Sequence, residues 1–123
     1  MATLHLNTQE FLEKISNYHH TNYWQYLGEK PCIIDFYTSW CKPCKTIAPL
    51  LEEVSIDYAE LITVYKINVD EEPELANAFG IRSLPTLIFC PINDTPSIIL
   101  GSISKQQLIE QIEATLLYSL EFA

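Results

Sequence analysis

The sequence predicts an α/β fold with a mixed central β-sheet of four or five strands, flanked by helices on both faces. Short apolar, β-rich runs recur along the chain, as at residues 31–37 and 61–70. A segment with apolar residues at helical spacing separates these two runs, which favours parallel strands joined by a crossover helix. Two later runs, 85–90 and 97–101, are separated only by a turn, so they should form an antiparallel hairpin.

The first elements follow from local patterns. Residues 3–6 would supply the fifth strand of the sheet. Thr8 can cap a helix whose apolar residues Phe11 and Ile15 lie one turn apart. Residues 17–30 mix polar with aromatic residues and show no helix or strand pattern, so they should form a connecting loop. Pro31 then opens the apolar run over 31–37, which suits a strand that is buried on both faces.

The central helices are marked by proline and glycine. Helical spacing of apolar residues predicts a long helix over 45–59, and Pro49 inside that pattern should kink it. The run over 61–70 then predicts the next strand. Pro73 fits the first turn of a short helix, and Gly80 fits its end.

The end of the chain predicts the hairpin and one last helix. Residues 91–96 combine Asn-Asp with two prolines and so predict the hairpin turn. Ser104 and Gln107 have the spacing of a capping box at the start of the helix. Its core face should carry Leu108, Ile112 and Leu116.

Composition excludes several classes of protein. The 123 residues are 48% hydrophobic, which is enough for one domain over residues 1–123 whose core needs no disulfide. The chain has 7 basic and 16 acidic residues, and it has no Lys/Arg cluster that could neutralise nucleic-acid phosphates. This argues against a nucleic-acid-binding protein. No apolar run is long enough to span a membrane. The first residues lack a signal-peptide pattern, so we expect the cytoplasm, or export if the chain is a trimmed piece of a longer protein.

The four cysteines do not have the pattern of a zinc site. Such a site needs four ligands, usually as two close pairs, and only Cys41 and Cys44 are close. Cys32 and Cys90 stand singly in apolar runs. The adjacent His19 and His20 are poor candidates to complete a ligand set, as is His5, and we expect all three histidines at the surface. The sequence therefore predicts no metal.

Cys41 and Cys44 lie where a strand ends and a helix begins, with Pro43 suited to the first helical turn. A helix N-terminus favours a thiolate, which lowers the pKa of the first cysteine and makes it a candidate nucleophile. The second cysteine, one turn away on the same face, can attack a mixed disulfide and release the product. A bare Cys-x-x-Cys is weak evidence, but its position between strand and helix is typical of redox chemistry.

The stretch "DFYTSWCKPCK" resembles the active-site signature of the thioredoxin family. The similarity continues through Pro49, Lys66, "NVDEEPELANAFGIRSLPT" and Gly101, and it covers nearly the whole chain, from about Thr8 to Leu116. It implies a thioredoxin fold and a protein-disulfide reductase without metal or organic cofactor. It also implies disulfide-containing protein substrates and thioredoxin reductase as electron donor. We expect a monomer.

The resemblance also implies roles for individual residues. Cys41 would be the nucleophile and Cys44 the resolving thiol. Pro85 would be a cis-proline beside the cysteines, and Leu84 would offer backbone hydrogen bonds to an extended substrate segment. The apolar patch on which the substrate docks would be bordered by three residues: Trp40, Leu84 and Gly101. The alternative for Trp40 is ordinary core packing.

Asp35 is the one acid in its apolar run, and burial would raise its pKa. By resemblance it accepts and returns the proton of the resolving cysteine through water, as a general base and then a general acid. Lys66 matches the lysine that pairs with this acid in the family. The alternatives are an Asp at a solvated strand edge and a lysine that faces solvent.

Lys42 departs from the family pattern, which usually has Gly before Pro43. A cation beside Cys41 should favour the thiolate and make the couple slightly more oxidising. Cys32 and Cys90 are additional cysteines, on strands that the fold places side by side and antiparallel; we favour two small buried hydrophobic residues over a redox pair. Two rival functions remain open: an exported reductase or isomerase, and a non-catalytic binding module that uses the apolar patch.

Overall fold

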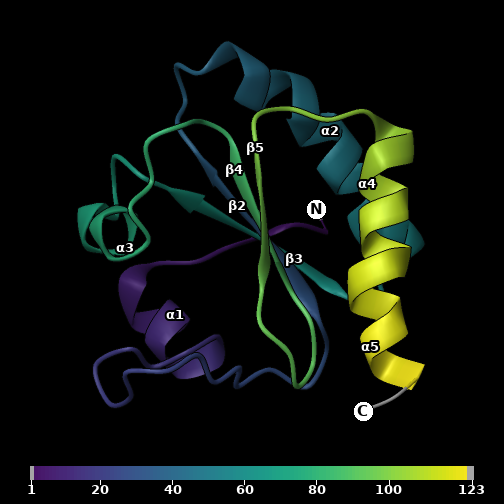
Figure 1. The fold of residues 1–123 in the computed structure, drawn as a ribbon. Coiled ribbons are helices and arrows are strands. Elements are labelled where there is room, and N and C mark those ends of the chain that lie inside the picture. Colours follow the sequence, from purple (N-terminus) through teal and green to yellow (C-terminus); the bar gives the residue numbers. More distant parts are fainter. Residues whose placement is uncertain (1, 122–123) are drawn as a thin grey trace.

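The computed structural model describes residues 2–121. Within this range, five strands form a mixed sheet in the order β1-β3-β2-β4-β5 (Figure 1). β1, β3 and β2 run parallel, β4 is antiparallel to β2, and β5 is antiparallel to β4. The mixed sheet, the terminal hairpin and the short first strand are thereby confirmed. The strands span Leu4–His5 (β1), Cys32–Tyr37 (β2), Thr63–Asn68 (β3), Thr86–Cys90 (β4) and Ser97–Leu100 (β5).

Helices cover both faces of this sheet (Figure 1). Their bounds are Thr8–Lys14 (α1), Lys42–Asp57 (α2), Pro73–Ala78 (α3), Lys105–Gln111 (α4), a π-helical segment Ile112–Leu117 (η1) and Tyr118–Glu121 (α5). The predicted core residues Leu108, Ile112 and Leu116 are all fully buried, as expected. The π-helical segment has no counterpart in the prediction.

The sheet separates two apolar cores, because neighbouring residues of a strand point to opposite faces. In β2, Ile33 packs with Ile47 of α2 and Leu108 of α4 in one core. Ile34 packs in the other core, with Phe11 of α1 among its neighbours. Residue 35 has the same parity as residue 33, so Asp35 points to the face that is covered by α2 and α4.

The start of α1 differs from the prediction by one residue. Asn7, not Thr8, is the N-cap: its Oδ1 accepts from the backbone N of Glu10 at 2.8 Å, and the Glu10 carboxylate accepts from the backbone N of Asn7 at 3.1 Å. Asn and Thr both cap helices well, but only Asn7 has a glutamate three residues on to complete the capping box. The Thr8 hydroxyl instead donates to Glu72 at 2.9 Å.

α3 and α4 begin where predicted, whereas the helix predicted over 45–59 begins three residues earlier and ends two residues earlier. α2 begins at Lys42 with Cys41 as its N-cap, and Pro43 lies in its first turn; the helix continues through Pro49. α3 begins at Pro73, and Gly80 follows it with a φ of 60°. Ser104 and Gln107 form the predicted capping box of α4.

Candidate functional site

Cys41 and Cys44 form a disulfide at the start of α2, with their Cα atoms 5.3 Å apart. Cys41 caps the helix, and its Sγ accepts from the backbone N of Cys44 at 3.3 Å. Both residues are nearly buried, with 6% of Cys41 and 3% of Cys44 exposed. A helix N-terminus carries unpaired N–H groups and a positive partial charge, which stabilise a thiolate at the Cys41 position when the disulfide is reduced. This end of α2 is therefore suited to thiol chemistry.

Asp35 is fully buried in β2, and neither of its carboxylate oxygens has a hydrogen-bond partner among the described residues. Burial raises the pKa of Asp35 from its ordinary 3.8 to about 7, while the positive charge of Lys66 acts in the opposite direction. The carboxyl is thus poised to gain or lose a proton near neutral pH. It points to the face of the sheet that carries α2, on which Cys44 is also buried. These facts exclude the alternative of a solvated strand-edge Asp.

Lys66 stands directly opposite Asp35 in the parallel β2–β3 pairing. Its ammonium nitrogen lies 4.5 Å from the centre of the Tyr37 ring, a cation–π contact. No ion pair joins Lys66 to Asp35 among the described residues. Among the described residues, Lys66 therefore acts on Asp35 through its nearby charge and not through a hydrogen bond.

The Leu84–Pro85 peptide bond is cis, and Pro85 is buried directly before β4. Gly101, directly after β5, donates its backbone N–H to the carbonyl of Pro85 at 2.8 Å. Its φ of 85° lies in the left-handed region that favours glycine. This hydrogen bond holds the predicted docking residues Leu84, Pro85 and Gly101 together at one end of the sheet.

Trp40 is 69% exposed directly before Cys41, which excludes the alternative of core packing. Its Nε1 donates to Asp70 Oδ2 at 2.9 Å, so the ring is fixed on the surface by a residue that follows β3. Sequence reasoning did not identify Asp70 as a site residue. The available signal was its place in "NVDEEPE", the acidic run within the matching segment.

Comparison with known proteins decides the family. The thioredoxin family model matches residues 3–114. The chain belongs to the thioredoxin family. It is 38% identical over 96 residues to the thioredoxin of Borreliella burgdorferi, a match that covers 78% of this chain and 82% of the relative. It is 44% identical over 85 residues to the thioredoxin of Alicyclobacillus acidocaldarius subsp. acidocaldarius, over 69% and 81% of the two chains.

A plant relative shows the same similarity over a shorter part of its own length. The chain is 40% identical over 86 residues to the chloroplastic M-type thioredoxin of Pisum sativum, which is 70% of this chain and 50% of the pea protein. Membership of the thioredoxin family and the Cys41–Cys44 disulfide together support thiol–disulfide exchange as the reaction, with disulfide-containing proteins as substrates.

The second cysteine pair of this thioredoxin-family chain lies at the other end of β2. Cys32 and Cys90 stand opposite each other in the antiparallel β2–β4 pairing, as predicted, and both are free and fully buried. A hydrogen bond with Cys32 and burial both raise the pKa of Cys90 well above its ordinary value. Because the thiolate is the reactive form, the raised pKa makes Cys90 less reactive. This favours the interpretation of Cys32 and Cys90 as small buried hydrophobic residues over that of a redox pair.

Other predicted features lie outside this site. The three histidines are exposed, and among residues 2–121 no group of three or more His, Cys, Asp or Glu side chains could hold a metal ion. Within the same range, no helix combines the length and apolar character that a membrane crossing needs.

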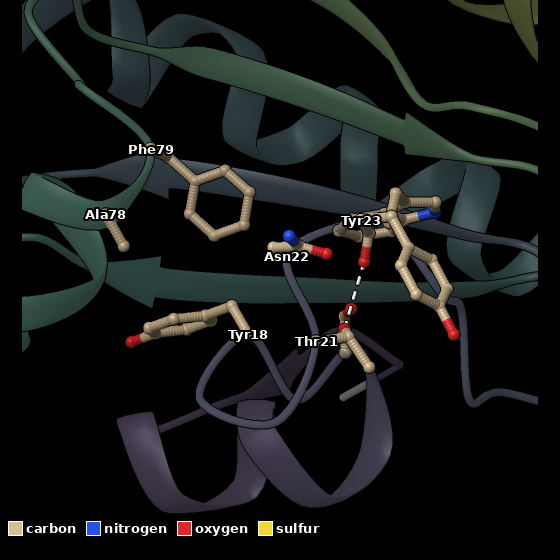
Figure 2. A pocket seen from close by; sticks show the side chains of 8 residues that line it. Tyr18, Thr21, Asn22, Tyr23, Ala78 and Phe79 are labelled. Atoms are coloured by element: carbon tan, nitrogen blue, oxygen red, sulfur yellow. Dashed lines mark hydrogen bonds between the residues drawn. The ribbon is translucent and has the colours of Figure 1, made fainter.

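A hollow of about 310 Å³ lies between the 17–30 connection and the end of α3. Figure 2 shows the rings of Tyr18 and Phe79 at its edge, and the Thr21 hydroxyl donates to the carbonyl of Tyr23 at 3.0 Å beside it. None of the predicted site residues lines this hollow. It is therefore separate from the disulfide.

Proposed function

We propose that this chain reduces protein disulfides by dithiol–disulfide exchange through Cys41 and Cys44. The observation that carries the proposal is their disulfide at the start of α2, on the face of the sheet to which the buried Asp35 points. A two-electron couple needs two sulfurs that can join without a large backbone movement, and a helical spacing of three residues provides this.

In the first step, the Cys41 thiolate attacks one sulfur of the substrate disulfide. The substrate S–S bond breaks, a mixed disulfide with Cys41 forms, and the other substrate sulfur leaves as a thiolate. The dipole of α2 and the backbone N–H of Cys44 stabilise the Cys41 thiolate. Trp40, Leu84, Pro85 and Gly101 would border the surface on which the substrate lies.

In the second step, Cys44 loses its proton to the Asp35 carboxylate and attacks the Cys41 sulfur. The mixed disulfide breaks, the second substrate sulfur leaves as a thiolate, and the Cys41–Cys44 disulfide remains. Two electrons have then passed from the protein to the substrate. A base that accepts this proton works best with a pKa near the working pH, which the value of about 7 for Asp35 provides. The charge of Lys66 keeps that pKa from rising further.

Several finer features of the function follow from resemblance to the family. We propose that thioredoxin reductase returns the disulfide to the dithiol, and that the chain works as a monomeric single domain in the cytoplasm. The cycle uses only thiol–disulfide exchange and proton transfer, so it needs no metal or organic cofactor. Lys42 and Pro43, between the cysteines, would tune the potential of the couple.

Reduction of insulin disulfides, driven by NADPH and thioredoxin reductase, tests this function. The wild-type chain should be active, Cys41→Ser should be inactive, and Cys44→Ser should accumulate a mixed disulfide that mass spectrometry detects. Asp35→Asn should slow the second step, by up to about a hundredfold, and should leave mixed-disulfide formation intact. If the wild-type chain is inactive with the reductase and also with dithiothreitol as donor, the proposal is wrong.

A further inference from the structure

Most of the basic side chains of this acidic protein already interact with another group of the chain. The sequence holds seven lysines and arginines against 16 acids. Lys14 and Lys105 lie 3.8 and 3.3 Å from glutamate oxygens. Lys30 donates to a carbonyl at 3.2 Å, and Lys66 lies over the Tyr37 ring. Four of the seven therefore already have a partner within the chain.

The three remaining cations lie close in sequence to the two cysteines or to Leu84. Lys42 directly follows Cys41, Lys45 directly follows Cys44, and Arg82 stands two residues before Leu84. All three are exposed, and their side chains make no ion pair or hydrogen bond with the part of the chain that the structure describes. The start of α2 and the α3–β4 connection, which carry them, lie at the same end of the sheet (Figure 1).

Arg82 also lines a groove beside the predicted docking residues. This groove measures about 370 Å³ and runs from the α3–β4 connection to β5, where Ile98 and Leu100 are 57% and 63% exposed. It borders the residues on both sides of Leu84 and Pro85. An extended substrate segment that reaches Cys41 past Leu84 would place neighbouring side chains near the guanidinium of Arg82.

We propose that Lys42, Lys45 and Arg82 form a basic rim that selects disulfide-containing proteins with acidic residues beside the reactive cysteine. This inference rests on the proposed function and names the substrate class for the same site. Cations without an internal partner keep their full charge available for a substrate carboxylate. Among the neighbouring acids, Asp70 accepts from Trp40 and makes no ion pair with any of the three cations in the described part of the chain.

The negative charge of the rest of the surface strengthens this selection of acidic substrates. A net charge of −9 repels an acidic partner from most directions, and a local cationic rim then favours the approach that brings the substrate to Cys41. The acidic run 70–74 lies on the Trp40 side of the site and would disfavour acids there. The rim should therefore affect both how fast and in which orientation a substrate docks.

Three synthetic peptides that differ only beside one disulfide-bonded cysteine would test the rim. Two neighbouring positions carry glutamate in the first, serine in the second and lysine in the third, and kcat/KM is measured for each. An exposed charge pair is worth about twofold, so two glutamates should gain about fourfold over the serine peptide and two lysines should lose about fourfold. The glutamate peptide should therefore be preferred over the lysine peptide by about sixteenfold at low salt. The preference should vanish in about 1 M salt, where the screening length falls to about 3 Å.

The variant Lys45→Glu/Arg82→Glu should remove or invert this preference, mainly through KM, because the charges act on encounter and binding. A change in the potential of the couple would alter the rates of all three peptides alike, so it cannot mimic a change in the preference, and Lys42, the residue proposed to tune the potential, is left in place. Lys14→Glu is a control for reversing one charge away from the site, since Lys14 ends α1 at the other end of the sheet (Figure 1), and it should keep the wild-type preference.

The outcomes separate the two proposals. If the wild-type chain does not reduce even the serine peptide, the proposed function fails. If it reduces all three peptides equally well at low salt, or if Lys14→Glu changes the preference as much as the double variant does, the basic rim is wrong and the function stands.

Discussion

Replacing Asp35 with asparagine should stabilise the folded protein at neutral and alkaline pH. Asparagine has nearly the same shape and does not ionise, so it removes a buried charge and leaves the packing of β2 intact. In the wild-type chain the carboxyl is fully buried, and its oxygens have no hydrogen-bond partner among the described residues. An unpaired buried charge is costly, and this cost is what raises the pKa of Asp35.

The magnitude follows from the pKa. One pKa unit corresponds to about 1.4 kcal/mol, so a rise from 3.8 to about 7 corresponds to about 4 kcal/mol of stability. The sign follows from proton binding. Between about pH 4 and 7 the unfolded carboxyl is ionised while the folded one keeps its proton, so the stability of the wild-type chain falls as the pH rises. The loss is complete above about pH 7.

Urea unfolding of the oxidised protein at several pH values would measure this effect. The advantage of Asp35→Asn over the wild type should be small below about pH 4, grow by about 1.4 kcal/mol per pH unit, and level off near 4 kcal/mol above pH 7. Asp57→Asn, which changes an exposed carboxyl of α2, is the control. An advantage of Asp35→Asn that does not vary with pH, or a loss of stability at pH 8, would refute the reasoning.

Three further substitutions test other parts of the site. Lys42→Gly should make the measured potential more negative by about 10 mV, which corresponds to about 0.5 kcal/mol for a two-electron couple; an unchanged potential would show that Lys42 does not tune it. Asp70→Asn weakens the acceptor for the Trp40 indole and should change the tryptophan fluorescence and raise KM by about threefold, since a hydrogen bond to a charged group is stronger than a neutral one; unchanged values would remove Asp70 from the site. Gly101→Ala places a side chain at a φ of 85° and should lower the free energy of unfolding in urea by about 1 kcal/mol, although the space around it is open; a neutral effect would show that the backbone relaxes there.

The sequence predicted the arrangement of the sheet because its patterns are strong and local. The apolar run of β2, the crossover helix α2 and the turn before β5 each carry their own signal. The helix caps were harder to predict, as at Asn7, because two neighbouring residues can both cap and only the side chain of Glu10 decides between them. The π-helical turn of η1 left no pattern that differs from an ordinary helix.

The reactive residues could be predicted by their spacing, but their contacts could not. Cys41, Cys44 and the burial of Asp35 follow from one short stretch of sequence. The hydrogen bond from Trp40 to Asp70 and the stacking of Lys66 on Tyr37 join segments that only the folded sheet brings together. Such contacts depend on register and side-chain direction, which periodicity alone does not give.

The complete burial of Cys32 and Cys90 determines when the protein should be oxidised during refolding. An unfolded chain exposes four thiols, which can pair in three ways when all are oxidised, and only the pairing with Cys41 joined to Cys44 is compatible with the active site. Once the sheet forms, two of the four thiols are withdrawn from solvent and scrambling stops. Refolding should therefore begin under reducing conditions, with oxidant added only after the core has closed.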